Sequence, residues 1–127
     1  MFDEELQAIT YAYTAWMHPR KDEAPLVYFG TDAKIDSFCC NRDVFCGNYR
    51  DERNPVEVQS GRLSDTNLQG GEPCGALHTH VNLRAGAAQK LHFFLGVAEG
   101  ALSDYDKAVA GAKDALTALR EAGAADL

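Results

Sequence analysis

No apolar run in the sequence approaches the ~20 residues that a helix needs to cross a bilayer, so we expect no membrane partner. A secretory signal is also missing. Residues 1–5 are acidic, whereas such a signal begins with basic residues and continues with apolar ones. These two absences together predict a cytoplasmic protein.

Basic residues are scarce. The chain has 12 Lys and Arg against 19 Asp and Glu over 127 residues, which gives a formal charge of −7. A net field of this sign repels a phosphate backbone, so nucleic acid is not an expected partner. A neutral ligand such as a sugar would be indifferent to this charge.

The chain has few cysteines and lacks several catalytic and cofactor-binding motifs. Without an export signal, the four cysteines are expected to be reduced and mostly buried rather than paired in disulfides: Cys39, Cys40, Cys46 and Cys74. An apolar content of 46% is enough for a core without such crosslinks. Walker-type loops, Gly-x-Ser-x-Gly elbows and Cys–His pairs are missing, and no cofactor is expected.

Short stretches with strand character fill the first two thirds of the chain. Residues 2–16 fit either a helical face or a turn at 3–6 followed by a strand, and the aromatic and β-branched content favours the strand. Further strands are expected at residues 26–29, closed by Gly30, and at residues 35–39, 44–46 and 56–58.

A hairpin is expected over residues 77–97. Leu77, Thr79, Val81 and Leu83 share one strand face, and apolar residues alternate again at 91, 93, 95 and 97, on the other side of a turn around Gly86. A single helix over residues 83–102 is the rival interpretation. It would place Gly86, Gly96 and Gly100 in its interior, each at a cost of about 1 kcal/mol relative to Ala.

The last segment has the pattern of an amphipathic helix. Ser103 suits an N-cap, Gly123 suits a stop, and five residues form the expected apolar stripe: Tyr105, Val109, Ala112, Leu116 and Leu119. The fold class predicted from these elements is mainly β, an antiparallel β-sandwich over residues 1–102 followed by a linker-like helix over residues 103–127.

One ordered pattern takes in most of the glycines, prolines and polar residues of the middle. It runs through residues 41–50 (NRDVFCGNYR), 54–58 (NPVEV), 61–64 (GRLS), 71–77 (GEPCGAL), 83–86 (LRAG) and 93–96 (FFLG). This string resembles the N-terminal sandwich domain of the glycosyltransferase 36 family, also called glycoside hydrolase family 94. That family includes cellobiose, cellodextrin and chitobiose phosphorylases and cyclic β-1,2-glucan synthases.

The resemblance implies a galactose-mutarotase-like super-sandwich of which this chain is the later part. The complete family chain continues into a helical linker and a large helical barrel, and it implies inverting phosphorolysis of a β-glucoside with its acid in that barrel. The chain is then expected to be a carbohydrate-binding wall or scaffold without catalytic residues of its own. A β-glucan oligosaccharide is the implied partner, and a homodimer is a further implied possibility.

Arg42 is the substrate-binding candidate that this resemblance implies, because the arginine of the motif resembles one that reaches the acceptor sugar. The alternative for Arg42 is a surface salt bridge with Asp43 or Asp51. Tyr49 and Arg50 are weaker candidates, whose expected role is packing and turn support.

A zinc-dependent hydrolase is the main alternative, and an unrelated binding module is another. On a strand, His78 and His80 would face the same side, roughly 6.5–7 Å apart, and could share a metal. Ser103 and Asp106 complete a metalloprotease-like spacing, but Val81 stands where that family has Pro, and the Ser-x-x-Asp pair is explained as helix capping. The competing interpretation places both imidazoles on a solvated face of the hairpin, with no metal.

Overall fold

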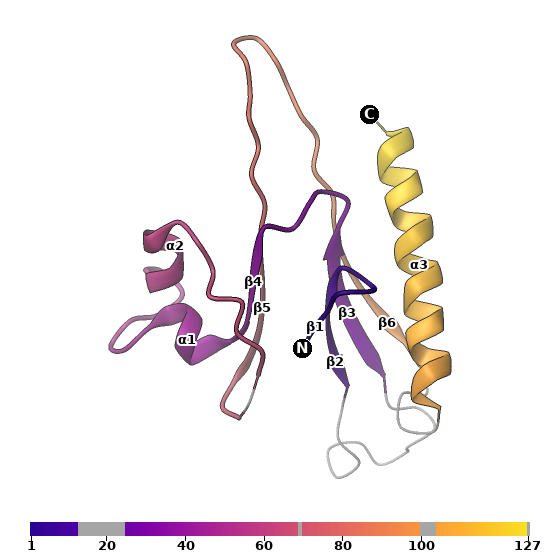
Figure 1. Cartoon of the computed structure of the whole chain (residues 1–127), viewed down its shortest axis with the longest axis horizontal. Coiled ribbons are helices and arrows are strands. Elements are labelled where there is room, and N and C mark those ends of the chain that lie inside the picture. Colours follow the sequence, from indigo (N-terminus) through magenta and orange to yellow (C-terminus); the bar gives the residue numbers. More distant parts are fainter. Residues whose placement is uncertain (13–24, 69, 100–103, 127) are drawn as a thin grey trace. The chain divides into compact units, whose positions relative to one another are not determined.

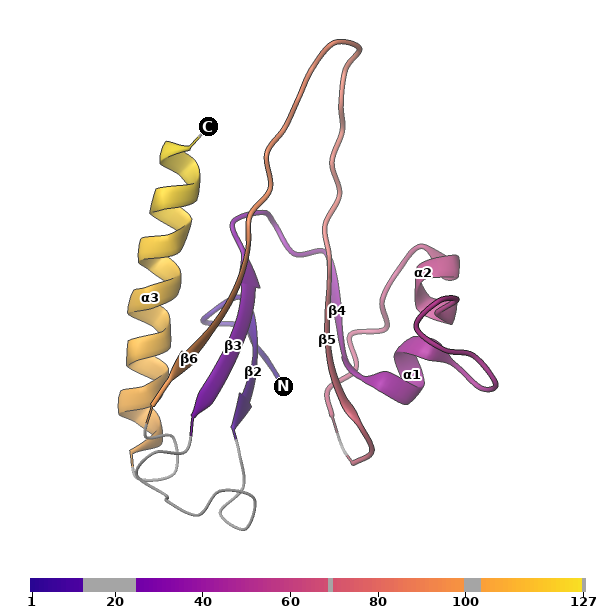
Figure 2. The same cartoon turned by 180° about the vertical axis from the view of Figure 1, so that it is seen from behind.

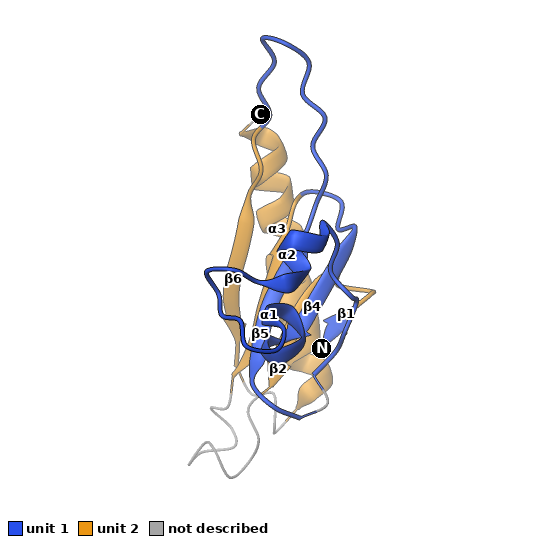
Figure 3. Ribbon diagram, turned by 90° about the vertical axis from the view of Figure 1, so that its left-hand side faces the viewer, with its two compact units in different colours: residues 1–2, 33–89 blue, residues 3–32, 90–127 orange. Residues whose placement is uncertain are grey.

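The computed structural model of the chain describes residues 1–12, 25–68, 70–99 and 104–126. They form two compact units, shown in two colours in Figure 3: residues 1–2 with 33–89, and residues 3–32 with 90–127. Antiparallel sheets with six strands and a C-terminal helix confirm the predicted fold class. The boundary placed between residues 102 and 103 stays a prediction.

A four-stranded sheet has the order β1-β2-β3-β6, and all of it except Phe2 belongs to the second unit. Its strands are β1 (Phe2–Asp3), β2 (Ala8–Ala12), β3 (Leu26–Thr31) and β6 (Phe93–Ala98). The carboxylate of Asp3 accepts a bond of 2.9 Å from the Leu6 amide in the turn before β2, which confirms the predicted turn. The predicted strand is confirmed up to Ala12, and residues 13–16 of that prediction lie outside the described residues. Gly30 lies inside β3 rather than closing it, because it pairs with both Ala8 and Phe94.

Helix α3 (Tyr105–Ala125) covers one face of this sheet (Figures 1 and 2). The core between helix and strands consists of Leu6, Ala8, Leu26, Tyr28, Ala108, Ala112 and Leu116. Ala112 and Leu116 confirm part of the predicted stripe, but Tyr105 and Leu119 are exposed. Ala108 and Ala112 let the helix lie close to the sheet, and Leu116 fills the space between them, whereas Tyr105 and Leu119 face away.

Both predicted ends of α3 need correction. Asp104 caps the helix by accepting from the Lys107 amide, and Ser103 lies outside the described residues. Gly123 does not stop the helix, which runs on to Ala125. A Cβ at this glycine would meet the Asp32 carboxylate at 2.6 Å, so the glycine serves a close approach rather than a helix end.

The first unit pairs β4 (Ser37–Asn41) with β5 (Pro73–His78) and adds two short helices, α1 (Arg42–Cys46) and α2 (Val56–Ser60). The strand expected at residues 35–39 is therefore displaced by two residues. The strands expected at residues 44–46 and 56–58 are wrong, because both stretches are helical.

Residues at the helix ends explain why these two segments are helical rather than extended. The Asn41 side chain accepts from the amides of Asp43 and Val44 at the start of α1. Gly61 closes α2 with φ of 77°, in the left-handed region that favours glycine. In segments of five residues, these end effects outweigh the alternation of apolar and polar residues.

The hairpin predicted over residues 77–97 is wrong in its pairing. Both strands exist, but β5 pairs with β4 in one sheet and β6 pairs with β3 in the other. Between them residues 79–92 carry no ladder pairing in the described part of the chain, and they turn where the Ala87 amide donates to the Arg84 carbonyl, next to Gly86 at φ of 79°. Period-two alternation predicts a strand without identifying its partner.

The cysteines behave as predicted. All four are free thiols, with Cys39, Cys40 and Cys46 buried and Cys74 partly buried. Burial raises the pKa of Cys74 to about 12, so its thiol is inert at neutral pH. Within the described residues, no helix is both long and apolar enough to span a membrane.

Gly96 and Gly111 allow a matched test of this packing. Gly96 pairs with Tyr28 across β3 and β6, and a Cβ there would overlap the tyrosine ring, so Gly96→Ala should lower the free energy of unfolding by about 1–3 kcal/mol. Gly111 is exposed on α3, where a Cβ meets nothing closer than 4.0 Å, so Gly111→Ala should raise that free energy by up to about 1 kcal/mol. Urea titration checks both changes, and equal effects would contradict the described sheet–helix contact.

Candidate functional site

Arg42, the predicted sugar contact, opens helix α1 and lies between two carboxylates. Its Nε and Nη2 atoms are 2.7 and 2.6 Å from Oε1 of Glu52, and its Nη1 is 3.5 Å from Oε2 of Glu72. The Arg42 amide also donates to the Glu72 carbonyl at 3.0 Å. The arginine is therefore held at both its backbone and its side chain, while 33% of that side chain stays exposed.

These carboxylates keep Arg42 charged. The hydrogen bond that the guanidinium donates to Glu52 raises the pKa of Arg42 above its usual range. The pKa of Glu52 is lowered, first by its own backbone amide and then by Arg42. The site thus presents a fixed cation whose remaining N–H groups can donate to an oxygen ligand.

The alternative prediction for Arg42, a surface salt bridge, is confirmed, but its partners are Glu52 and Glu72 rather than Asp43 or Asp51. Asp51 pairs instead with Arg53 at 3.1 Å, and no ion pair between Arg42 and Asp43 is found in the described part of the chain. A sugar contact of Arg42 stays a prediction, because an ion pair to exposed carboxylates neither requires nor forbids a ligand.

The loop after α1 is built by Arg50, as predicted. Its Nε donates to the Asn54 carbonyl and its Nη2 to the Asn54 side-chain oxygen, both at 2.7 Å. Tyr49 contradicts its expected packing role, because its side chain is fully exposed and its φ is 60°. Glu52, which holds Arg42, lies in this same loop, so Arg50 supports the candidate site indirectly.

The two histidines considered for zinc have other partners. His78 Nδ1 is 3.0 Å from the Ser37 hydroxyl and His80 Nδ1 is 2.8 Å from the Asp36 carboxylate. The two rings lie 4.5 Å apart, but in the described residues no group of three or more His, Cys, Asp and Glu side chains could hold a metal. Asp106 belongs to the first turn of α3, but Asp104 caps the helix and Ser103 lies outside the described residues, so the capping interpretation of the Ser103–Asp106 pair is not confirmed.

Glu57 is a buried carboxylate that the sequence did not reveal. Only 7% exposed on α2, it accepts a bond of 3.1 Å from the Ser64 amide through Oε1, while its Oε2 has no partner among the described residues. The alternation at residues 56–58 had suggested a strand, and the change to a helix is what turns Glu57 inward. Its contact with the Ser64 backbone indicates a role in holding the segment after α2.

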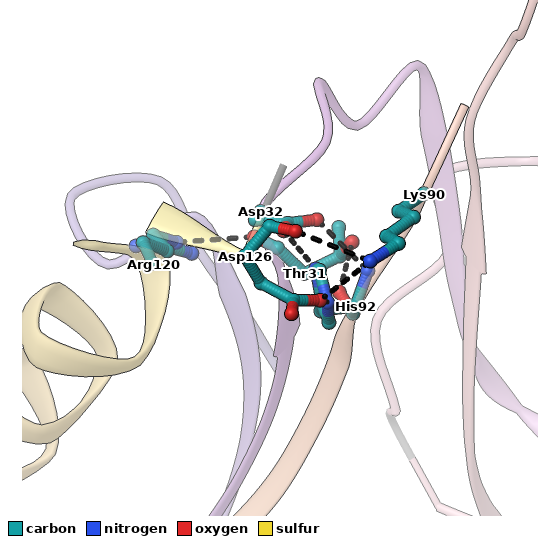
Figure 4. A network of polar contacts seen from close by, with 6 residues as sticks. All are labelled: Thr31, Asp32, Lys90, His92, Arg120 and Asp126. Carbon is teal, nitrogen blue, oxygen red and sulfur yellow. Dashed lines mark hydrogen bonds and ion pairs between the residues drawn. The ribbon is translucent and has the colours of Figure 1, made fainter. Parts of the chain in front are cut away.

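A second polar cluster closes the C-terminal end of α3 in the other unit (Figure 4). His92 lies between two carboxylates, with Nδ1 2.6 Å from Asp32 and Nε2 3.0 Å from Asp126. The Asp32 carboxylate also accepts from the His92 amide at 3.0 Å, and Lys90 pairs with Asp126 at 3.5 Å. Sequence alone could not find this cluster, because Asp32 and His92 are 60 residues apart.

Each partner in this cluster shifts the pKa of the other. The hydrogen bond to Asp32, followed by that to Asp126, raises the pKa of His92. The backbone amide of His92 is the main cause of a lowered pKa at Asp32. The geometry is that of an ion-paired clasp on a helix end, and the Thr31 hydroxyl beside it donates to the His92 carbonyl at 2.8 Å.

Comparison with known proteins identifies related sequences. Residues 1–119 match the family model described as Glycosyl hydrolase 94, supersandwich domain. The chain is 39% identical over 96 residues to the N,N'-diacetylchitobiose phosphorylase of Vibrio furnissii, covering 68% of this chain and 12% of that protein. It is 36% identical over 73 residues to the enzyme of the same name from Vibrio proteolyticus, covering 58% of this chain and 9% of that one.

A third relative has a different substrate in its name. The 3-O-beta-D-glucopyranosyl-beta-D-glucuronide phosphorylase of Paenibacillus borealis is 32% identical over 77 residues, which are 61% of this chain and 10% of that protein. In every case the chain spans only a small part of the relative.

The clasp at His92 generates a pH test. Because the pKa of His92 is raised in the folded state, its ion pairs contribute their full stabilisation below pH 6.5, the ordinary pKa of histidine. This contribution is lost as pH rises through the folded-state pKa. The lowered pKa of Asp32 stabilises the fold above the ordinary value of 3.8 and is lost as pH falls through its folded-state pKa. His92→Gln should therefore reduce the free energy of unfolding most between these two ordinary values.

Chemical denaturation over a pH series measures this difference. Lys113→Gln is the control. Lys113 lies on the same helix and forms an ion pair of 3.0 Å with Glu5, and its replacement removes this pair without involving a histidine. A difference between wild type and His92→Gln that stays constant from acid to alkaline pH would show that the clasp does not form.

Proposed function

Because the chain belongs to glycosyl hydrolase family 94 through the supersandwich domain of that family, we propose that it is the sandwich portion of a glycoside phosphorylase. In this role it forms a scaffold and one wall beside a sugar site. The observation that carries the proposal is the family match over residues 1–119, nearly the whole chain. Support comes from the matched relatives, which are all named as phosphorylases.

The proposed reaction of the complete protein is inverting phosphorolysis of a glycoside. A phosphate oxygen bonds to the anomeric carbon, the glycosidic C–O bond breaks, and a carboxylic acid gives its proton to the leaving oxygen. We propose that this acid and the phosphate pocket lie outside these 127 residues, since the matched stretch is at most 12% of the length of each relative.

Three carboxylates of the described residues support the proposal that the acid lies elsewhere. Asp32 and Asp126 are occupied with His92, and Glu57 is buried against the Ser64 backbone. The lowered pKa of Asp32 favours the ionised form, whereas a general acid must carry a proton. Asp32 is therefore unsuited to act as the general acid.

Arg42 is the residue through which this domain would contact sugar. Its guanidinium is fixed by Glu52 and Glu72, and it remains one-third exposed. Fixed N–H groups donate to hydroxyl oxygens with little loss of side-chain entropy, so a positioned arginine can orient an acceptor sugar. A homodimer and a cytoplasmic location stay predictions.

A chimera tests the function and the role of Arg42 together. In the Vibrio furnissii enzyme, the stretch that this chain matches is replaced by this chain, and phosphorolysis of N,N'-diacetylchitobiose is followed as release of sugar phosphate. Arg42→Ala should lower kcat/KM roughly ten- to hundredfold, because a charge-assisted bond to a sugar hydroxyl is lost.

Arg53→Ala is the matched control. Arg53 is 91% exposed and pairs only with Asp51 in the described residues, so its removal should leave kcat/KM unchanged. An unchanged kcat/KM for Arg42→Ala would leave the domain a purely structural role. A folded chimera without any activity would count against the proposal that this chain serves a phosphorylase.

A further inference from the structure

His78 and His80, at the end of β5, each have one ring nitrogen held and the other free. Nδ1 of His78 is 3.0 Å from the Ser37 hydroxyl, and Nδ1 of His80 is 2.8 Å from the Asp36 carboxylate. Among the described residues, neither Nε2 atom has a hydrogen-bond partner. Each imidazole is therefore oriented through Nδ1 and keeps Nε2 for a ligand.

The β4–β5 pair fixes the residues that orient these rings. Ser37 lies opposite His78 in the antiparallel register, and the Asp36 amide donates to the His78 carbonyl at 2.8 Å. The Ser37 hydroxyl is buried and also accepts from the Leu63 amide at 3.1 Å. All of these residues belong to the first unit, so the arrangement needs nothing from the second.

The partner of His80 decides which of its nitrogens can bind a metal. The hydrogen bond with His80 lowers the pKa of Asp36, so this carboxylate is ionised and can only accept. The proton of a neutral His80 ring then lies on Nδ1, and the lone pair lies on Nε2. Metal-binding histidines in proteins have this same arrangement, with the second ring nitrogen donating to a carboxylate or another oxygen.

The distance between the two rings fits a shared ion. A metal in the plane of an imidazole, bound at about 2.0–2.1 Å, lies roughly 3.2 Å from the ring centre. Two rings bound at right angles about one metal are then roughly 4.5 Å apart between centres, whereas tetrahedral positions give roughly 5.2 Å. The centroids of His78 and His80 are 4.5 Å apart. This separation matches neighbouring positions of a tetragonal ion, the geometry typical of Cu²⁺ and Ni²⁺.

We propose that His78 and His80 together bind one divalent transition-metal ion of tetragonal geometry, Cu²⁺ or Ni²⁺, through their Nε2 atoms. Water fills the other positions, because in the described part of the chain no third His, Cys, Asp or Glu completes a ligand group. The site thus differs from the catalytic zinc centre of a hydrolase, which has three protein ligands. It is a binding site only, and it does not depend on the proposed function.

His92 supplies a matched control within the same chain. Its Nδ1 is 2.6 Å from Asp32 and its Nε2 is 3.0 Å from Asp126, so both nitrogens are held by carboxylates. Because both nitrogens donate in this arrangement, neither keeps a lone pair for a metal. His92 is therefore not expected to bind the ion.

Calorimetric titration of the untagged 127-residue chain with nickel chloride at neutral pH tests the site. One Ni²⁺ should bind per chain. His78→Ala and His80→Ala should each weaken binding by at least about tenfold, since one of two ligands is lost. Asp36→Asn should weaken it about ten- to hundredfold, because the carboxylate that orients His80 is lost. His92→Gln should leave the affinity unchanged.

Four results would overturn the proposal. They are no Ni²⁺ binding by the folded chain, an affinity that His80→Ala and Asp36→Asn both leave unchanged, equal binding in concentrated urea, and a site lost with His92→Gln. Far-UV circular dichroism of each variant separates a lost ligand from a lost fold. Asp36→Asn keeps both imidazoles, so it tests the orienting contact even if removal of a histidine disturbs the strand pair.

Discussion

The guanidinium of Arg120 ties helix α3 to the ends of two strands, and the second unit depends on this contact. It donates to the carbonyls of Thr31, Leu6 and Gln7 at distances of 2.8–3.0 Å. Figure 4 shows its bond to Thr31, next to the His92 clasp on the same helix end. Burial lowers the pKa of this arginine, so its three bonds offset part of the cost of burying a charge.

With the helix held in this way, α3 covers one face of the sheet, and the other face exposes apolar side chains of β6. Ala108, Ala112 and Leu116 fill the space over β2 and β3, while β6 leaves Leu95 and Val97 to solvent. The core therefore lies on the α3 side of the sheet, while apolar side chains of β6 stay exposed on the other side.

The sequence predicted those features that depend on local pattern. The strand predicted at residues 26–29 runs to Thr31 in the structure, the alternation at residues 91–97 falls on β6 (Phe93–Ala98), and the predicted C-terminal helix is α3. Helices α1 and α2 were missed because the caps at Asn41 and Gly61 decide five-residue segments. The partner of β6 and the clasp at His92 could not be predicted, since both join residues about 60 positions apart.

The candidate site was predictable only in part and only through a family pattern. The ordered string around Arg42 identified the family, and the family match confirms that identification. The partners of Arg42 could not be predicted, because Glu52 and Glu72 reach it through loops whose course no periodicity describes. Glu57 was hidden for the same reason, since its burial follows from α2 being a helix.

The central claim is that this chain contributes a wall to a sugar-processing site and no chemistry of its own. Assaying the purified 127-residue chain with phosphate and either N,N'-diacetylchitobiose or cellobiose tests it most directly. The account predicts no release of sugar phosphate, because rate enhancement requires the acid, the phosphate pocket and the sugar to be held together. Phosphorolysis by the isolated chain, above that of a heat-denatured sample, would contradict the account.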